Sequence, residues 1–288
     1  MRTTLLLLAL LLPSAALAGP WTPEPGAGYA KVQARWLPGI GWFGGPGEDP
    51  VFYGVYNEVF LGGFYAELGL APRMSLSVAS DGLRLFFLQD PRDGSVGSHA
   101  SFGEPTLTLT VQPVQAGPFA LSVNGFVRPP GTPNDVVQDV VSVEDGNPVI
   151  GGLRIGTGVI EGGLGLSLGG GFNRFYLAGG ARALFRGGGW DTVLEWSAEA
   201  GTSVGKLQKT HLRLRLAGFH PLKDGEAPYH SSPSGIGNGT AYAAFTIEIE
   251  RSVTERSVVG VSIAGGLGPV VRQTGGPVIT GYWATAWP

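Results

Sequence analysis

The sequence predicts an all-β protein: a transmembrane antiparallel up-and-down β-barrel of about twelve strands that follows an N-terminal signal peptide. Two observations lead to this prediction. Apolar and polar residues alternate along many short segments, as in Leu212-Arg213-Leu214-Arg215-Leu216, where one face is all leucine. No amphipathic helix is expected to cover these leucine faces, and the opposite faces carry charge, Ser, Thr and Gly. A closed barrel with hydrocarbon outside and a polar lumen inside satisfies both faces.

The first residues have the features of a secretory signal peptide. Arg2 supplies the positive charge, Leu5 to Leu12 the apolar segment, and Ala16-Leu17-Ala18 an A-x-A cleavage motif. The apolar segment is too short to be a membrane anchor. We therefore expect residues 1–18 to be the signal peptide and residues 19–288 to form one outer-membrane barrel domain.

The composition excludes several classes of protein. The chain has no Cys, so a disulfide scaffold and a Cys-ligated metal centre are excluded. The 49 Gly and 22 Pro disfavour long helices. A formal charge of −3 without any Lys/Arg run gives no indication of nucleic-acid binding. We expect no cofactor and no metal.

Twelve segments have the alternation typical of strands. They lie near residues 28–38, 52–69, 74–88, 104–113, 117–128, 159–169, 174–186, 190–201, 207–219, 239–251, 256–266 and 277–287. Gly82 stands where the apolar phase changes within the third segment, which is typical of a β-bulge.

The connections between the segments fall into two classes. Every second connection is short, at 71–73, 115–117, 170–173, 202–206 and 252–255. The others are mostly long, at 39–51, 89–103, 129–158, 220–238 and 267–276, and only 187–189 breaks the rule. Outer-membrane barrels show this segregation, with short turns on the periplasmic side. An even number of strands places both termini on that side.

If the leucine faces look outward, the remaining faces line a lumen. The inward charges nearly balance; they are Lys31, Arg35, Arg84, Arg174, Arg182, Arg213, Arg215, Glu67, Glu161, Glu195, Glu199, Glu248 and Glu250. A strongly ion-selective pore would show a ring of one sign. Twelve strands lie between a filled barrel of about eight and an open porin of about sixteen. We therefore expect a narrow or gated lumen.

Several rings also face inward, and their role has two interpretations. Tyr65, Phe86, Phe126, Tyr176 and Tyr242 either fill space between the charges or form a track for an apolar or aromatic solute. In the second interpretation Tyr65, Phe86, Phe126 and Tyr242 contact the solute. The inward charges, which include Arg182, Glu195, Glu199, Arg213, Arg215 and Glu248, then set the field and the shape. The loop at 129–158 either folds in as a lid or plug or stays on the surface as a solvated loop.

Two enzyme-like features are weak. Gly165-Leu166-Ser167-Leu168-Gly169 matches G-x-S-x-G, but it lies within an alternating strand and no helix follows it. His99 and His230 lie in long connections beside serines, so an outer-membrane lipase- or protease-like hydrolase is an alternative. The four histidines have no metal-binding spacing. We expect no enzyme activity.

Aromatic residues mark the strand ends. Tyr29, Trp36, Phe185, Trp190 and Phe219 are placed to form a girdle at the headgroup level. The last strand carries Tyr282, Trp283 and Trp287, which resembles the terminal signal read by the barrel-assembly machinery, although Pro288 follows it. The expected partners are therefore outer-membrane lipids, that machinery and a small hydrophobic solute.

The order of segments resembles a known family. The stretches GGFYAELGLAPRMSLSVAS, GEPTLTLTVQPVQAGPFALSVNGFVRPPG and LRIGTGVIEGGLGLSLGGG are similar to hairpins of the phenol-degradation meta-pathway family of outer-membrane proteins. The resemblance covers roughly residues 60–287 and implies a barrel that takes hydrophobic, often aromatic, compounds across the outer membrane. Related hydrocarbon channels carry an N-terminal plug of a few dozen residues. Here only Gly19 to Ala27 precede the first strand, too few to fill a lumen.

The sequence thus predicts a channel that passively admits small hydrophobic or aromatic solutes through a narrow lumen. The hydrolase is one alternative. The other is a non-conducting barrel with a structural or adhesive role, in which the loops are the working parts.

Overall fold

The computed structural model describes residues 20–39, 41–43, 56–89, 94–144, 147–205, 208–223, 225, 232, 234, 236–267 and 273–288. The expected signal peptide at 1–18, His230 and parts of the long connections lie outside these ranges. Over the described ranges the regular structure is all β, and no helix there is long and apolar enough to cross a membrane.

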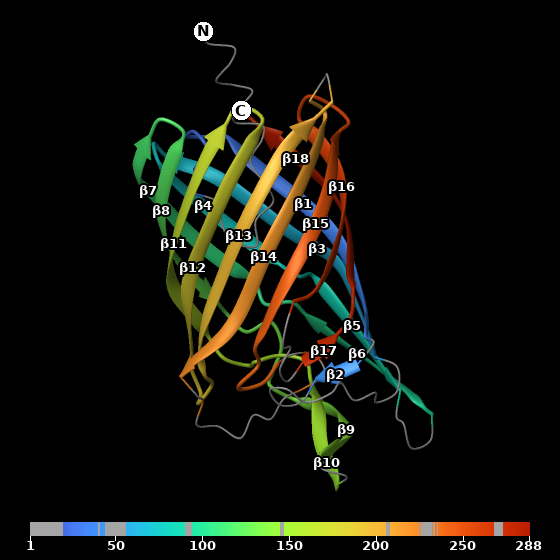
Figure 1. Ribbon diagram of the computed structural model, residues 1–288. Helices are drawn as coiled ribbons and strands as arrows, with labels where there is room; N and C mark the ends of the chain where they lie inside the picture. The colour runs from blue at the N-terminus through green and yellow to red at the C-terminus, as the bar shows by residue number, and fades with distance from the viewer. Residues whose placement is uncertain are drawn as a thin grey trace.

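Twelve antiparallel strands form a closed ring (Figure 1). In spatial order they are β1 (Gly28–Gly39), β3 (Tyr56–Ala71), β4 (Met74–Ser80), β7 (Thr106–Ala116), β8 (Phe119–Arg128), β11 (Glu161–Phe172), β12 (Phe175–Arg186), β13 (Thr192–Val204), β14 (Thr210–Lys223), β15 (Tyr242–Ser252), β16 (Ser257–Gly266) and β18 (Val278–Trp287). β1 closes the ring because it pairs with β3 on one side and with β18 on the other. The prediction of a twelve-strand antiparallel barrel is confirmed, and each predicted segment overlaps one of these strands.

Six further strands extend or decorate the ring at one end. β5 (Leu83–Gln89) continues the wall beyond β4, and β6 (Val96–Phe102) pairs with β5. β9 (Val136–Glu144) and β10 (Asn147–Arg154) form a hairpin within the long loop, and β2 (Gly41–Phe43) pairs with β17 (Gln273–Gly275). Figure 1 shows these two small sheets together at the lower end of the barrel. β2, β6, β9, β10 and β17 were not predicted as separate strands.

A break at Asp81 and Gly82 separates β4 from β5, where a change of apolar phase was predicted. This glycine has φ +72°, and a Cβ there would collide with the backbone of Leu61 and Gly62. β3 shifts at the same height, where Gly62 has φ +67°. The side chains of β3 therefore change face: Glu67 and Tyr65 point inward on one side of the shift, and Glu58 and Phe60 on the other.

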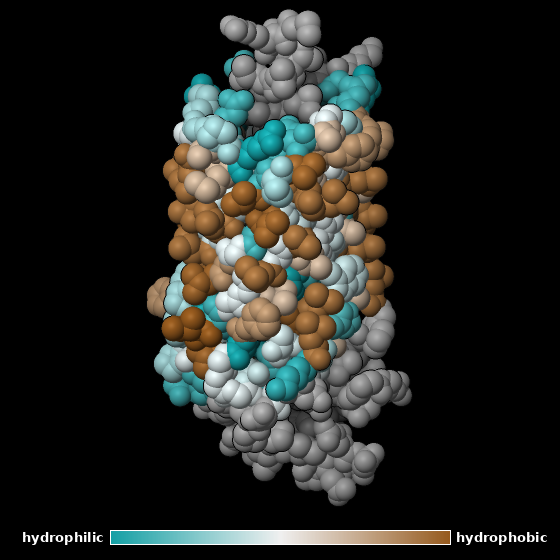
Figure 2. All heavy atoms as spheres, turned by 90° about the vertical axis from the view of Figure 1, so that its left-hand side faces the viewer, coloured by the Kyte–Doolittle hydropathy of each residue, from teal (hydrophilic) through white to brown (hydrophobic). Residues whose placement is uncertain are grey.

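The barrel wall is apolar outside and polar inside. Leu164, Leu166 and Leu168 are 65%, 56% and 59% exposed, although they belong to the middle of a regular strand. Thr110 and Ser167, which face the other way, are buried. On the face that Figure 2 shows, apolar side chains are spread over the middle of the wall, and hydrophilic residues are more frequent toward its ends. An exposed aliphatic band of this extent is stable against hydrocarbon and not against water.

The two ends of the barrel differ as predicted. β3–β4, β7–β8, β11–β12, β13–β14 and β15–β16 are joined by short turns at one end, called here the short-turn end. Four of these turns use the left-handed backbone conformation, at Arg73 (φ 65°), at Gly117 (φ 59°), at Asn173 (φ 51°), and at Gly205 and Gln208 (φ 81° and 50°). β1 begins and β18 ends at the same end, at the top of Figure 1. The opposite end, called the long-loop end, carries β2, β17, β9 and β10.

The aromatic girdle forms only in part. Trp36 and Phe185 are exposed on the outer wall as expected, at 45% and 54%. The other three rings turn away from the outer wall: Tyr29 lies beside Tyr65, Phe219 stacks on Tyr242, and Trp190 is buried against Arg186.

Candidate functional site

A ladder of ion pairs crosses four neighbouring strands on the inner wall. Arg182 of β12 pairs with Glu195 of β13, and Glu199 of β13 pairs with Arg215 of β14. Arg213 of β14 then pairs with Glu248 of β15. In each pair the two residues stand directly opposite each other in the strand register. Oppositely charged cross-strand neighbours stabilise a sheet and here also fix its register.

The predicted charges of this wall are therefore brought together as pairs. Arg213 binds two carboxylates, because its second nitrogen lies 2.8 Å from Glu250 Oε2. Arg213 and Glu250 are both buried. On this wall three arginines pair with four glutamates, so most of the charge is neutralised. A largely neutralised wall offers an ion little selective field.

Tyr282 extends this ladder of ion pairs by two hydrogen bonds that pass over a glycine of the strand between. The Tyr282 hydroxyl of β18 lies 2.8 Å from Glu248 Oε1 and 2.8 Å from Glu250 Oε2. Strand β16 stands between them, and Tyr282 passes over its Gly260, where a Cβ would collide with the ring. Lys31 Nζ of β1 lies 3.8 Å from the centre of the Tyr282 ring, which is a cation–π contact.

The opposite wall holds two further polar clusters. Nearer the short-turn end, Tyr65 donates a hydrogen bond of 2.7 Å to Glu67, and Ser75 donates one of 2.6 Å to the other oxygen of Glu67. Nearer the long-loop end, Arg84 Nε donates to Glu58 at 2.8 Å, and Tyr56 donates to the same carboxylate. These clusters satisfy carboxylates that would otherwise be costly to bury.

The four rings expected to contact a solute have different surroundings. Phe126 is buried and lies over Gly163, with the Arg182 guanidinium 4.6 Å from its ring centre. Tyr242 is half-buried and stacks on Phe219 at 5.7 Å. Tyr65 points its hydroxyl at Glu67.

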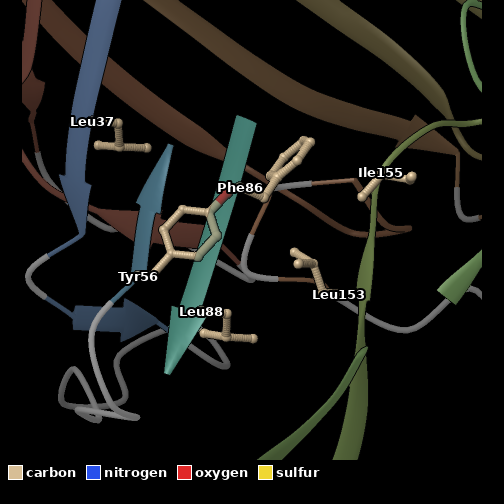
Figure 3. Packing of buried hydrophobic residues seen from close by; sticks show 6 residues of the cluster. All are labelled: Leu37, Tyr56, Phe86, Leu88, Leu153 and Ile155. Carbon is tan, nitrogen blue, oxygen red and sulfur yellow. The ribbon is translucent and has the colours of Figure 1, made fainter. Parts of the chain in front are cut away.

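Phe86 lies in a packed apolar cluster at the long-loop end. Leu37, Tyr56 and Leu88 surround it from the wall, and Leu153 and Ile155 come from the long loop (Figure 3). Phe86 and Leu153 are fully buried. Leu153 and Ile155 occupy the space from which a solute would touch Phe86, so contact with this ring requires these two residues to move.

The segment 153–157 of the long loop is therefore folded into the barrel, and we call it the inner lid. It is held by polar contacts at both ends. The Arg154 backbone N–H donates to Ser232 at 2.8 Å, and Thr157 Oγ1 donates to Glu104 at 2.7 Å. Of the 129–158 loop, residues 153–157 thus pack inward, whereas the β9–β10 hairpin extends from the lower end of the barrel (Figure 1).

A second cluster narrows the same end from the other side. Asp191 is fully buried and forms an ion pair with Arg186. Its carboxylate accepts a hydrogen bond of 2.8 Å from Gly239 N, and its backbone N–H donates to Asn238 at 2.9 Å. Asp191 thus joins the β12–β13 connection to the chain that precedes β15.

Six charges differ from the predicted inner set. Glu58, Asp81 and Arg128 pair with the predicted Arg84, Arg35 and Glu161, and Asp191 pairs with Arg186. None of Glu58, Asp81, Arg128, Arg186 and Asp191 was predicted to face inward. Conversely, Arg174 was expected in the lumen but lies exposed in the turn between β11 and β12. The tight turn at Asn173 places Arg174 at the rim rather than on the strand.

The described residues offer weak support for a hydrolase. Among the described residues, Ser203 of β13 forms a hydrogen bond of 3.0 Å with Nδ1 of His211 on β14. Glu250 stands opposite His211, but its Oε2 is bound by Arg213 and Tyr282. His99 of β6 stands opposite Phe86 of β5, and His230 lies outside the described residues. Within the described ranges, no three His, Asp or Glu side chains are grouped as a metal site would require.

Comparison with known proteins identifies the fold. No protein-family model and no curated protein matches the sequence. The structure is similar to the crystal structure of the COG4313 outer membrane channel from Pseudomonas putida F1, with a TM-score of 0.67 at 10% identity, over 95% of this chain and 100% of that one. The KdgM porin in complex with disordered oligogalacturonate matches with a TM-score of 0.48 at 6% identity, over 90% of this chain and 99% of that one. At 10% identity, the likeness to the Pseudomonas putida channel shows a shared barrel fold. The phenol-degradation resemblance stays a prediction.

Proposed function

We propose that the protein is a gated outer-membrane channel that passively admits small hydrophobic or aromatic solutes. The observation on which this proposal depends is the inner lid, in which Leu153 and Ile155 of a loop rest on Phe86 at the long-loop end of the barrel. The segment is held by a few apolar contacts and by hydrogen bonds of two residues, Arg154 and Thr157. A solute that makes similar apolar contacts can displace a loop held in this way.

The barrel itself supports this assignment. Its outer wall presents aliphatic side chains along the strands, which suits a lipid bilayer. The expected signal peptide and aromatic last strand agree with export and with insertion by the barrel-assembly machinery. The Pseudomonas putida protein of similar fold is described as an outer membrane channel, and we extend that role to this chain.

The inner wall favours neutral over charged solutes. Arg182, Arg213 and Arg215 each pair with a glutamate, so the field of these charges is largely cancelled by a near neighbour. A solute that passed Phe86 would next meet Phe126 and Tyr242, and near the short-turn end it would meet Tyr65. The predicted rings then form a track, with Arg182, Glu195, Glu199, Arg213, Arg215 and Glu248 fixing its shape.

Uptake and conductance test this proposal. In cells, Phe126→Ala should lower the uptake of a neutral aromatic probe, because it removes a ring from the track; Leu121→Ala, on the outer wall of the same strand, is the control. In a planar bilayer the folded protein should show small, intermittent openings. Unchanged uptake in Phe126→Ala would argue against the track, and persistent silence of folded protein against a channel.

One observation favours a second candidate, the non-conducting structural or adhesive barrel. The ion pairs of the inner wall and the clusters at the long-loop end place fixed groups on the inner side of the wall. This candidate gains support if a variant with a disrupted inner lid is as silent as the wild type.

A further inference from the structure

The six residues Pro20 to Pro25 lie inside the barrel at the short-turn end. The Trp21 ring meets the Tyr176 ring of β12 edge-on, with 6.2 Å between centres. Thr22 bonds to Gln112 of β7 through both its hydroxyl, at 3.0 Å, and its backbone N–H, at 3.2 Å. Tyr176 and Gln112 both belong to the inward-facing sets of their strands.

The two residues that follow this segment anchor it on the other side of the lumen. Gly26 N donates to Gly69 O at 2.9 Å, and Gly69 N donates to Ala27 O at 2.9 Å. Gly69 belongs to β3, which neighbours β1. In the ring of twelve strands β12 is the sixth strand from β1 in either direction. The segment therefore spans the lumen from one wall to the facing wall.

The inner wall has a glycine at each of the two places where the N-terminal segment contacts it. At Gly169 of β11 a Cβ would lie 2.7 Å from Pro20 Cγ and 2.7 Å from Trp21 Cη2. At Gly69 a Cβ would lie 2.6 Å from the carbonyl oxygen of Pro23. Neither glycine has a positive φ, so the backbone conformation does not require glycine at these positions. The close approach of the N-terminal segment explains why a side chain would not fit there.

We propose that Pro20 to Pro25 is a crossbar that narrows the short-turn mouth, and that Trp21 sets the width a solute must fit. This inference rests on the proposed channel function. Few residues suffice, because a segment that crosses a lumen restricts it without filling it. The indole and the Tyr176 ring together make an apolar edge, which favours slender apolar solutes over hydrated ions.

Thiol labelling tests whether the crossbar is seated. The chain has no cysteine, so Thr22→Cys and Glu24→Cys each introduce a single thiol. Thr22 is half-buried against Gln112, whereas Glu24 is exposed. In the folded, detergent-purified barrel, a bulky maleimide should label Thr22→Cys at least about tenfold more slowly than Glu24→Cys, because labelling must wait for the segment to leave the wall. Equal rates would overturn the crossbar.

Conductance tests what the crossbar does. Trp21→Ala should raise single-channel conductance at least about twofold by widening the constriction. Trp36→Ala, on the outer wall, is the control and should conduct like the wild type. Slow Thr22→Cys labelling with unchanged conductance in Trp21→Ala would overturn the role of Trp21 and leave the channel function intact. Silence in every variant, including one without Pro20–Glu24, would overturn the channel function, while a labelling difference would still support a seated crossbar.

Discussion

Tyr282 of β18 reaches Glu248 of β15 at 2.8 Å, across the strand that stands between them. This contact exists because Gly260 of that strand has no side chain. The same arrangement recurs where Tyr176 covers Gly201 and where Phe126 covers Gly163. The high glycine content of the chain is thus in part a packing requirement: a ring lies flat on the inner wall only where the neighbouring strand leaves room.

The first prediction concerns this contact. Gly260→Ala should destabilise the folded barrel by roughly 1–3 kcal/mol, because the added methyl displaces Tyr282 from its two carboxylates. Unfolding in guanidinium chloride, followed by tryptophan fluorescence in detergent, measures the change. Gly281→Ala is the matched control, since its Cβ would point into open space. Equal unfolding midpoints for the two variants would contradict the packing role of Gly260.

Arg213 gives the second prediction. Arg213→Met leaves Glu248 and Glu250 buried without their cation, and loss of one partner from a buried ion pair costs about 3–5 kcal/mol. We expect a large loss of stability in the same unfolding assay. Adding Glu248→Gln and Glu250→Gln should restore most of it, because the amides carry no charge. Arg251→Met, at an exposed position of β15, should change little.

Most of the barrel strands could be predicted from the sequence, but fewer of the contacts inside the barrel could. The twelve strands could be predicted because one side of each faces hydrocarbon, which requires aliphatic residues at every second position. Glu58 was missed for a local reason: the backbone shift at Gly62 reverses the faces of β3, so the phase read from Tyr65 and Glu67 does not extend to it. A single positive-φ glycine is a weak sequence signal, and only Gly82 was recognised.

The inner lid and the crossbar could not be predicted from the sequence, for a different reason. Leu153, Ile155 and Trp21 contact residues far away in the chain, and no local alternation reports such contacts. Asp191 likewise lies in a connection, where its pairing with Arg186 and Gly239 depends on how two loops meet. Loop residues that pack inward carry the composition of a core but not its periodicity.

The inner lid gives the third prediction. Leu153→Ser should increase the fraction of time the channel is open, because it removes apolar contacts with Phe86 and its neighbours without changing the barrel wall. Bilayer recordings at constant voltage measure the open fraction. Ile160→Ser is the control: Ile160 lies in the same connection but is 66% exposed. An unaltered open fraction in Leu153→Ser would show that the lid does not control passage.

The fourth prediction concerns the medium around the barrel. Leu166, in the middle of β11, is 56% exposed, and Val253, in the short turn after β15, is 55% exposed. In water, Arg would be tolerated equally at both positions. In a bilayer, Leu166→Arg places a charge near the midplane and should cost roughly 2–4 kcal/mol, whereas Val253→Arg lies at the interface and should cost about 0–1 kcal/mol. Unfolding of the two variants from lipid vesicles measures the difference. Because the side chains are matched in exposure, a clear difference can come only from depth in the membrane, and equal costs would mean that the aliphatic wall does not face lipid.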